Sequence, residues 1–338
     1  MVPPDRSGPS TGVVDEGLTV HCGFDIGGTK VLGVAVTDDP VRPQAVRRRP
    51  TTYDAGALVD TIVGMVADLE HDTGQPCEGL GLGIAGIVDR QGTLRYSPNI
   101  PGVVDLPIRR LLVEALERPV VVENDATAAT WAEATLGAGQ GSDHVAFVAL
   151  GTGIGTGFVV DGRLLRGWNG FAGESGHMTV DKDGPLHITG APGPWEYFAS
   201  GNGLGRMARE AAAAGGLGAV REAAGSVDAI RGEHVHHAVV EGDAEALELV
   251  RAFAREVAVG VANLVHVLDP EVVVIGGGLV EMGSVLVDAV RDHTHELVLG
   301  GPHRPRPEVV GARLGSRAGA LGSALLVAAE LGGGPSPH

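Results

Sequence analysis

The sequence predicts an α/β protein built from two domains. Its 338 residues are about twice the length of an ordinary domain, and 43% of them are hydrophobic, which is enough to form a core in each half. Apolar runs typical of strands alternate along the chain with segments of helical periodicity. Each half also begins with a strand, a glycine-rich turn and a return strand, which indicates an internal duplication.

The first half is expected to contain four strands and two helices. A strand over 18–24 leads through a tight turn into a return strand over 31–37. Apolar positions at helical spacing predict a helix over 55–72. The remaining elements are strands over 80–87 and 118–122, and a helix over 126–136 that Asn124 or Asp125 would cap.

The second half opens with the same kind of hairpin, a strand over 144–150 and a return strand over 157–160. The stretch 211–226, rich in Ala and Gly, is expected to be helical and to face solvent. Trp131 and Trp168 are expected to pack or to anchor loops. The other elements expected are a helix over 244–268, a strand over 272–275 and a terminal helix over 318–331.

These elements suggest an N-terminal α/β domain over 18–138 and a larger C-terminal α/β domain over 139–315. The terminal helix, about 316–331, would pack back on the first domain. Residues 1–17 lack an apolar core and predict a disordered leader and not a signal peptide, and 332–338 predict a loose tail.

Charge and cysteine content exclude several classes of protein. Lys and Arg number 25 against 42 Asp and Glu, and the net charge of −17 argues against a nucleic-acid partner. Because Cys22 and Cys77 are the only cysteines, a disulfide scaffold and a cysteine-rich metal site are excluded, and a cytoplasmic location is expected. No apolar run reaches the ~18 residues of a membrane helix, so no membrane partner is expected.

Glycine-rich turns follow three apolar strands, at Gly27-Gly28-Thr29, Gly151-Thr152-Gly153 and Gly276-Gly277-Gly278. Backbone N–H groups at such turns can point into one crevice and hold an anion. Thr29 and Thr152 would add hydroxyl donors to phosphate oxygens, and Asp25 would hold the water shell of Mg²⁺. The turns therefore predict a site for a nucleoside triphosphate with Mg²⁺, although the chain has no P-loop motif.

Four motifs occur in the order typical of the ROK family of bacterial sugar kinases and sugar-responsive repressors, which the chain resembles over roughly 18–330. The motifs are Asp25-Ile-Gly-Gly-Thr-Lys30, Val122-Glu-Asn-Asp-Ala126, Leu150-Gly-Thr-Gly-Ile-Gly155 and Gly173-Glu-Ser-Gly-His-Met178. The resemblance implies the actin-like ATPase/hexokinase fold, in which two α/β domains with a duplicated ββ core hold their ligands in the cleft between them.

The resemblance also implies residue roles. Asp125 would be the general base that accepts the proton of the attacking sugar hydroxyl, although an Asp at this position also suits a helix cap. The residues implied to bind the sugar are Asn99, Asn124, Glu174, His177 and Glu196. Those assigned to nucleotide binding are Asp25, Gly27, Gly28, Thr29, Lys30, Gly151, Thr152, Gly153, Gly276, Gly277 and Gly278.

The chain departs from the family at its zinc motif. The three positions where ROK kinases carry cysteines hold His187, Thr189 and Pro194 here, and Thr and Pro cannot replace thiolates at a tetrahedral zinc. We therefore expect no structural zinc, and a loop that packing braces, for example through Trp195.

The resemblance implies ATP-dependent phosphorylation of a hexose, with glucose as the default and N-acetylmannosamine, fructose or a C7-cyclitol as alternatives. Only 24 residues precede Asp25, too few for the helix-turn-helix of a ROK repressor, so that class is close to excluded. A non-catalytic sugar-binding protein remains a further alternative. Family members often form dimers, and a homodimer is expected.

Overall fold

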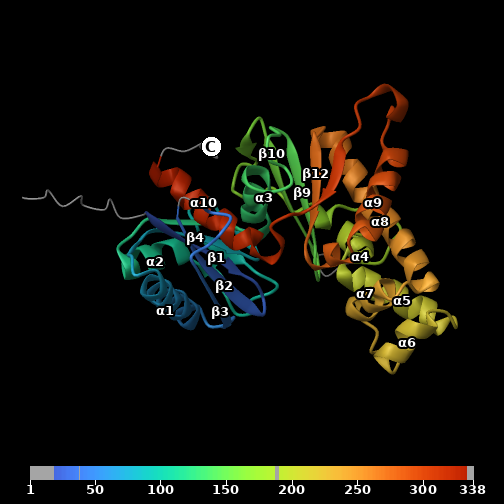
Figure 1. Cartoon of the computed structure of the whole chain (residues 1–338), viewed down its shortest axis with the longest axis horizontal. Helices are drawn as coiled ribbons and strands as arrows, with labels where there is room; N and C mark the ends of the chain where they lie inside the picture. The colour runs from blue at the N-terminus through green and yellow to red at the C-terminus, as the bar shows by residue number, and fades with distance from the viewer. Residues whose placement is uncertain (1–18, 38, 187–189, 333–338) are drawn as a thin grey trace, which may run out of the picture.

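The computed structural model describes residues 19–37, 39–186 and 190–332 as two five-stranded sheets with their covering helices (Figure 1). The predictions of a leader over 1–17 and of a tail lie outside the described residues, apart from Gly332, which ends the last helix. Within the described part of the chain, no helix is both long enough and apolar enough to cross a membrane.

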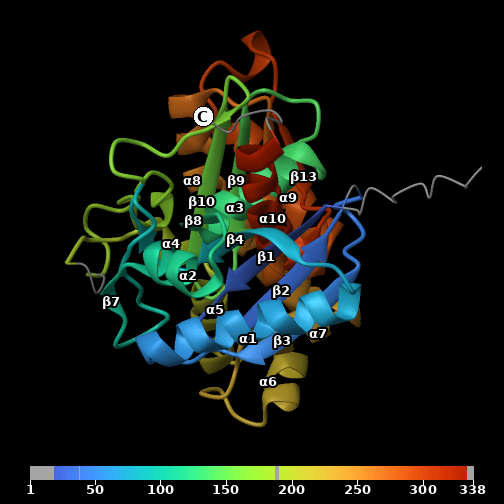
Figure 2. The same cartoon turned by 90° about the vertical axis from the view of Figure 1, so that its left-hand side faces the viewer.

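The first sheet has the strand order β3-β2-β1-β4-β8. Strand β2 is antiparallel to both of its neighbours, β1 and β3, whereas β4 and β8 run parallel to β1. These strands span Val20–Ile26 (β1), Lys30–Val36 (β2), Ala45–Pro50 (β3), Cys77–Ile84 (β4) and Val120–Asn124 (β8). Helix α1, Ala55–Thr73, crosses one face of this sheet, and α2, Ile108–Leu116, lies beside it (Figure 2).

The second sheet repeats this arrangement in the order β11-β10-β9-β12-β13. Its central antiparallel pair is again followed by two parallel strands. The strands span Val145–Leu150 (β9), Ile154–Val160 (β10), Arg163–Leu164 (β11), Val272–Gly276 (β12) and Glu308–Gly311 (β13). The two sheets confirm the predicted α/β fold class and its duplicated ββ unit.

Most helices of the second half cover one face of the second sheet and share its hydrophobic core. They are α4 (Trp195–Ala199), α5 (Gly201–Ala213), α6 (Gly218–Ala224), α7 (Gly232–Val240), α8 (Ala244–Leu268) and α9 (Ser284–Leu297). Short 3-10 turns η1 (Ser175–His177), η2 (Gly278–Met282), η3 (Gly301–His303) and η4 (Gly315–Arg317) connect the elements.

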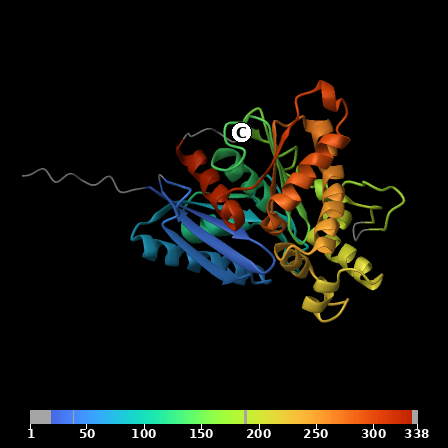
Figure 3. The ribbon, with the colours of Figure 1, turned by 45° about the vertical axis from the view of Figure 1, so that its right-hand side comes forward.

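Helices α3, Asp125–Thr135, and α10, Ala318–Gly332, pack on each other and on the first sheet. Figure 3 shows α10, in red, lying over the blue strands of the first half. Glycines allow this close packing, because a Cβ at Gly81 of β4 would clash with the backbone of Ser323, and one at Gly322 with that of Ala128. Helix α3 also contacts β9 and β10, so it links the two sheets.

The expectations about side-chain exposure hold in part. The stretch 211–226 is split between α5 and α6 and most of it is exposed, but Leu217 and Val220 are buried in the core of the second half. Trp131 is buried as expected, but Trp168 does not pack, since 91% of its surface is exposed. Trp168 lies in a loop after β11 that faces a small third sheet of β5 (Ile87–Val88), β6 (Leu94–Tyr96) and β7 (Val104–Leu106).

Candidate active site

The ends of three parallel strands bring Asp25 and Asp125 to one edge of the first sheet. Asp25 is the next-to-last residue of β1, and Asp125 directly follows β8. Strand β4 lies between them, and its Gly83 is in register with Asp25. Because a Cβ at Gly83 would lie only 3.3 Å from the Cα of Asp125, this glycine leaves room for the start of α3.

The junction between β8 and α3 separates the roles of Asn124 and Asp125. Asn124 is the helix cap: its Oδ1 accepts a 3.1 Å hydrogen bond from the N–H of Thr127, and its Nδ2 donates to the carbonyl of Gly86, also at 3.1 Å. Asp125 is the first helical residue, and its Oδ1 accepts from the N–H of Ala126 at 2.9 Å. The capping alternative considered for Asp125 therefore applies to Asn124.

The environment of Asp125 suits a group that exchanges a proton. Burial raises the pKa of Asp125 above its usual value, and the backbone N–H of Ala126 offsets part of that rise. A raised carboxyl pKa lies closer to neutral pH, where a general base works best.

Asp25 occupies a more strongly perturbed position. Burial first, and then the charge of Asp125, raise the pKa of Asp25 to about 7, and Lys30 opposes that rise. The carboxyl group also lies against the first turn of α10, because a Cβ at Gly319 would be 2.9 Å from its Cγ. A carboxylate destabilised in this way favours a nearby cation, and carboxylate oxygen is a ligand type that suits Mg²⁺ and its water shell. Asp25 therefore fits the role of anchoring the metal that accompanies a nucleotide.

Residues of the second half form the other side of the site. His177 Nε2 lies 3.7 Å from Glu174 Oε2, so the pair predicted from its spacing does meet. Burial raises the pKa of Glu174, the charge of His177 opposes this, and the charges of Asp125 and Glu196 add to it. Glu174 therefore lies close enough to the carboxylates of Asp125 and Glu196 to be affected by their charges.

Glu196 connects this acidic group to the second glycine turn. Its Oε2 accepts a 2.8 Å hydrogen bond from the N–H of Ile154, the first residue of β10. A Cβ at Gly153 would clash with the same carboxylate, so a side chain there would displace Glu196 from this hydrogen bond. The turn of Gly151, Thr152 and Gly153 is thus held against a residue that the sequence analysis assigned to sugar binding.

The first glycine turn lies beside Asn99, another residue expected at the sugar. A Cβ at Gly28 would be 2.9 Å from the Asn99 carbonyl oxygen, and the Asn99 side chain itself is exposed. The hydroxyl of Tyr53 donates to the carbonyl of Gly28 at 2.8 Å, which fixes the turn from its other side. Thr29 and Lys30, which follow, are exposed.

The third glycine turn abuts the second. Gly277, between Gly276 and Gly278, has a φ of +81°, and a Cβ there would clash with the backbone of Leu150. Because Leu150 directly precedes Gly151, the ends of β9 and β12 meet at this point, where the two strands run parallel.

One ion pair at this site was not predictable from the sequence motifs. Arg166, in the loop after β11, bonds through Nε to Oε2 of Glu123, the residue before Asn124. Both side chains are almost nine-tenths buried, with 11% and 12% of their surfaces exposed. The pair joins the second half to β8, the strand that leads to Asp125, and no motif around Arg166 signals it.

The segment that replaces the family's zinc loop is partly described. Positions 187–189 lie outside the described residues, while Pro194 forms a bridge to Thr179. Trp195 is fully buried, and its Nε1 donates to the carbonyl of Glu256 at 3.1 Å, so this side chain does brace the segment. Among the described residues no three His, Cys, Asp or Glu are grouped to hold a metal ion, and the absence of zinc stays a prediction.

Comparison with known proteins matches residues 21–330 to the model of the ROK family. A glucokinase from Streptomyces coelicolor is 36% identical over 312 residues, which cover 91% of this chain and 96% of the relative. An N-acetyl-D-glucosamine kinase from Photobacterium profundum is 33% identical, with 91% and 99% covered. The crystal structure of a ROK family glucokinase from Streptomyces griseus in complex with glucose and AMPPNP superimposes with a TM-score of 0.82 at 38% identity, covering 91% of this chain and 98% of that one.

The family match thus spans both sheets and every glycine turn described above, and it agrees with the paired hairpins of the fold. Relatives of this identity are aligned over nearly their whole length. On these grounds the chain belongs to the ROK family.

Proposed function

We propose that this chain, an ATP-dependent sugar kinase of the ROK family, phosphorylates a hexose, with glucose as the first candidate, and uses Asp125 as its general base. The observation that supports the proposal most strongly is the position of Asp125. Burial raises the pKa of Asp125, and its charge, like that of Glu196, raises the pKa of Glu174 in the second half. A polyol between the two halves would meet acceptors from both sides.

In this mechanism Asp125 accepts the proton of the hydroxyl that attacks the γ-phosphoryl group. Asn99, Asn124, Glu174, His177 and Glu196 would bind the other hydroxyls, since Glu with His supplies acceptors and a donor. The N–H groups of the three glycine turns, with Thr29, Thr152 and Lys30, would hold the phosphates. Mg²⁺ bound with ATP would neutralise part of the phosphate charge, and Asp25 would anchor the water shell of the metal.

The choice of glucose rests on relatives and not on a contact in this structure. The glucokinases that the chain resembles favour it, and the N-acetylglucosamine kinase relative makes a 2-acetamido sugar the second candidate. N-acetylmannosamine, fructose and a C7-cyclitol remain within the same class. A homodimer is part of the proposal, and light scattering of the purified chain tests it.

A coupled assay of phosphoryl transfer with a panel of hexoses, acetamido sugars and cyclitols identifies the substrate. Asp125→Asn should lower kcat by about 10²–10⁴-fold while the sugar still binds, since the general base contributes on that order. Asp60→Asn, at an exposed position on α1, is the matched control and should leave kcat unchanged. Equal activity of Asp125→Asn and the unaltered chain would remove Asp125 from the mechanism.

A further inference from the structure

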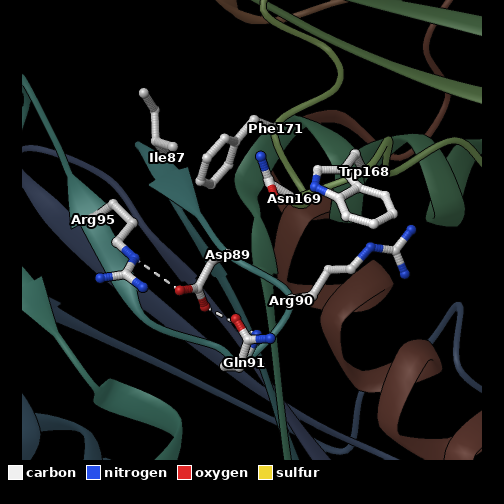
Figure 4. A pocket seen from close by; sticks show the side chains of 8 residues that line it. All are labelled: Ile87, Asp89, Arg90, Gln91, Arg95, Trp168, Asn169 and Phe171. Atoms are coloured by element: carbon white, nitrogen blue, oxygen red, sulfur yellow. Dashed lines mark hydrogen bonds and ion pairs between the residues drawn. The ribbon is translucent and has the colours of Figure 1, made fainter.

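A pocket separate from the residues of the candidate active site lies between the β5–β6 hairpin of the first half and the loop after β11 (Figure 4). Its volume is about 500 Å³, within the range of sites for small organic ligands. Apolar side chains and neutral amides share its lining with two arginines and one carboxylate. Besides Asp89 and Arg95, the residues that line it are Ile87, Arg90, Gln91, Trp168, Asn169 and Phe171.

Hydrogen bonds across the two halves form this pocket in advance of any ligand. The guanidinium of Arg90 donates to the carbonyl of Gly167 from Nε at 3.1 Å and from Nη2 at 2.7 Å. The backbone N–H of Arg90 donates to the carbonyl of Asn169 at 3.2 Å. A Cβ at Gly170, whose φ is +97°, would lie 2.9 Å from the carbonyl oxygen of Val88. The loop is therefore seated directly on the hairpin.

The hairpin wall is braced internally as well. Asp89 accepts backbone hydrogen bonds from Gln91 and Thr93, both at 2.9 Å, and its other oxygen accepts from Nε of Arg95 at 2.8 Å. Asp89 is thereby committed to structure and does not contribute an unbalanced charge to the pocket.

Several groups in the pocket have binding capacity that the fold does not use. Trp168 exposes 91% of its surface, although burial of its ring would be strongly favourable. Among the described residues, the indole N–H of Trp168 and the side-chain amides of Gln91 and Asn169 have no hydrogen-bond partner. Figure 4 shows the Trp168 ring and the Asn169 amide close together, with Phe171 beside them.

We propose that this pocket is a second carbohydrate subsite that takes one pyranose ring. The C–H face of a pyranose would cover the indole of Trp168, while its hydroxyls, each a donor and an acceptor, would bond to the two amides and the Arg90 guanidinium. A ligand without hydroxyls would leave the amides unpaired, and one without an apolar face would leave the indole in water.

The subsite adjoins the site proposed for the reacting hexose, and in this respect the inference rests on the proposed function. Ile87 directly follows Gly86, whose carbonyl accepts the hydrogen bond from Asn124. On the other wall, Asn169 lies five residues before Glu174 in the same connecting segment. The ring would be the second unit of a disaccharide substrate or a separate free hexose, and both present the same chemistry.

Quenching of tryptophan emission by iodide gives a direct measurement. The chain has three tryptophans, and Trp131 and Trp195 are 5% and 0% exposed, so iodide reports on Trp168. We expect glucose, maltose or cellobiose to protect the emission from iodide. Trp168→Ala should abolish the signal, Asn169→Ala should weaken the protection, and Leu299→Ala, which alters an exposed apolar side chain elsewhere, should leave it unchanged.

Two further measurements distinguish the sources of the ring. If it belongs to a disaccharide, maltose or cellobiose is phosphorylated, and Trp168→Ala raises the KM for that sugar by about tenfold while kcat/KM for glucose stays unchanged. If it is a free hexose, calorimetry gives two glucose molecules per chain, and one in Trp168→Ala.

If none of the sugars protects the Trp168 emission from iodide, the subsite proposal is overturned, even where glucose is phosphorylated normally. Protection that depends on protein concentration instead of sugar also overturns it and identifies a protein interface. Protection by sugar without any phosphorylation would retain the subsite and overturn the proposed function alone.

Discussion

Asp25 and Asp125 lie at the same edge of the first sheet, and only β4 separates the strands that lead to them. Gly83 of that strand contributes no side chain between them. Burial and the charge of Asp125 raise the pKa of Asp25 to about 7, while burial raises the pKa of Asp125 itself. The protonation of one carboxyl group near neutral pH therefore affects the other.

The first prediction concerns Asp25→Asn and pH. Because the pKa of Asp25 rises from 3.8 to about 7 on folding, the native state binds more protons than the unfolded state between these values. The stabilising contribution is present below pH 3.8 and is lost as the pH rises through 7. Asp25→Asn removes the ionised form, so it should raise the Tm relative to the unaltered chain at about pH 8 and much less at about pH 5.

The rate of phosphoryl transfer should depend on pH in the opposite direction to stability, so it should rise as the pH rises. Phosphoryl transfer by the unaltered chain should decline as the pH falls below about 7, where Asp25 becomes protonated, and the raised pKa of Asp125 adds to this decline. Asp60→Asn is the control for both measurements, since its carboxylate is exposed. A Tm difference between Asp25→Asn and the unaltered chain that is equal at both pH values would contradict the assignment.

The second prediction uses two adjacent glycines at the end of β12. Gly277→Ala should lower the free energy of unfolding by about 2 kcal/mol or more, since Ala would have both a φ of +81° and a clash with the Leu150 backbone. Urea unfolding of the ligand-free chain measures this. The KM for ATP should rise as well, because the displaced Leu150 leads into the second glycine turn.

Gly278→Ala is the matched control for that experiment. A Cβ at Gly278 would meet no atom within 4 Å, and the residue starts the short η2 turn. Its free energy of unfolding should change by less than about 0.5 kcal/mol. Equal losses in the two variants would show that the close approach of β12 to β9 does not constrain this turn.

The third prediction concerns Glu133, a fully buried residue of α3. Its Oε1 accepts from the N–H of Leu314 at 2.8 Å, and its Oε2 accepts from Ala138 at 2.8 Å and from Arg313 at 3.2 Å. These bonds hold the segment between β13 and α10 against α3. Glu133→Ala should lower the free energy of unfolding by about 3 kcal/mol or more, because it leaves three amides without their acceptor.

Glu133→Gln separates the hydrogen bonds from the volume of the side chain. Its amide retains one acceptor oxygen, so the loss of stability should be smaller than for Ala. Glu114→Ala removes an exposed carboxylate from α2 and should change the free energy of unfolding by less than about 0.5 kcal/mol. A loss in Glu133→Ala no larger than this control would show that the carboxylate does not hold the segment.

The regular elements were predictable because their apolar spacing is local. The helix expected over 244–268 coincides with α8, and strand 144–150 differs from β9 by one residue. Most of 211–226 is exposed as expected, but Ala and Gly carry too weak a periodicity to show that Leu217 and Val220 face a core.

Contacts between distant parts of the chain could not be predicted in this way. Two of the three partners of Glu133 are 180 and 181 residues away, and Arg166 is 43 residues from Glu123. The motifs did bring Glu174 and His177 together correctly, since three residues in one tight turn fix their separation. They gave no indication that a tryptophan in the neighbouring loop would stay exposed.

The last prediction tests whether the Glu123–Arg166 pair couples the two halves. Arg166→Met removes one partner of an ion pair whose side chains are almost nine-tenths buried. The loss of a buried partner costs about 3–5 kcal/mol, mostly because the remaining charge stays in a poorly solvated place. Since the loop after β11 leads to Glu174, the KM for the hexose should rise together with the loss of stability.

A double-mutant cycle separates the pair from its surroundings. Glu123→Gln with Arg166→Met removes both charges, so the double variant should lose less stability than the two single variants summed. The hexose KM of the double variant then identifies the role of the pair. If stability recovers while the KM stays high, the ion pair positions the loop that carries Glu174. If both recover, the high KM of Arg166→Met came from the charge that Glu123 retains in that variant.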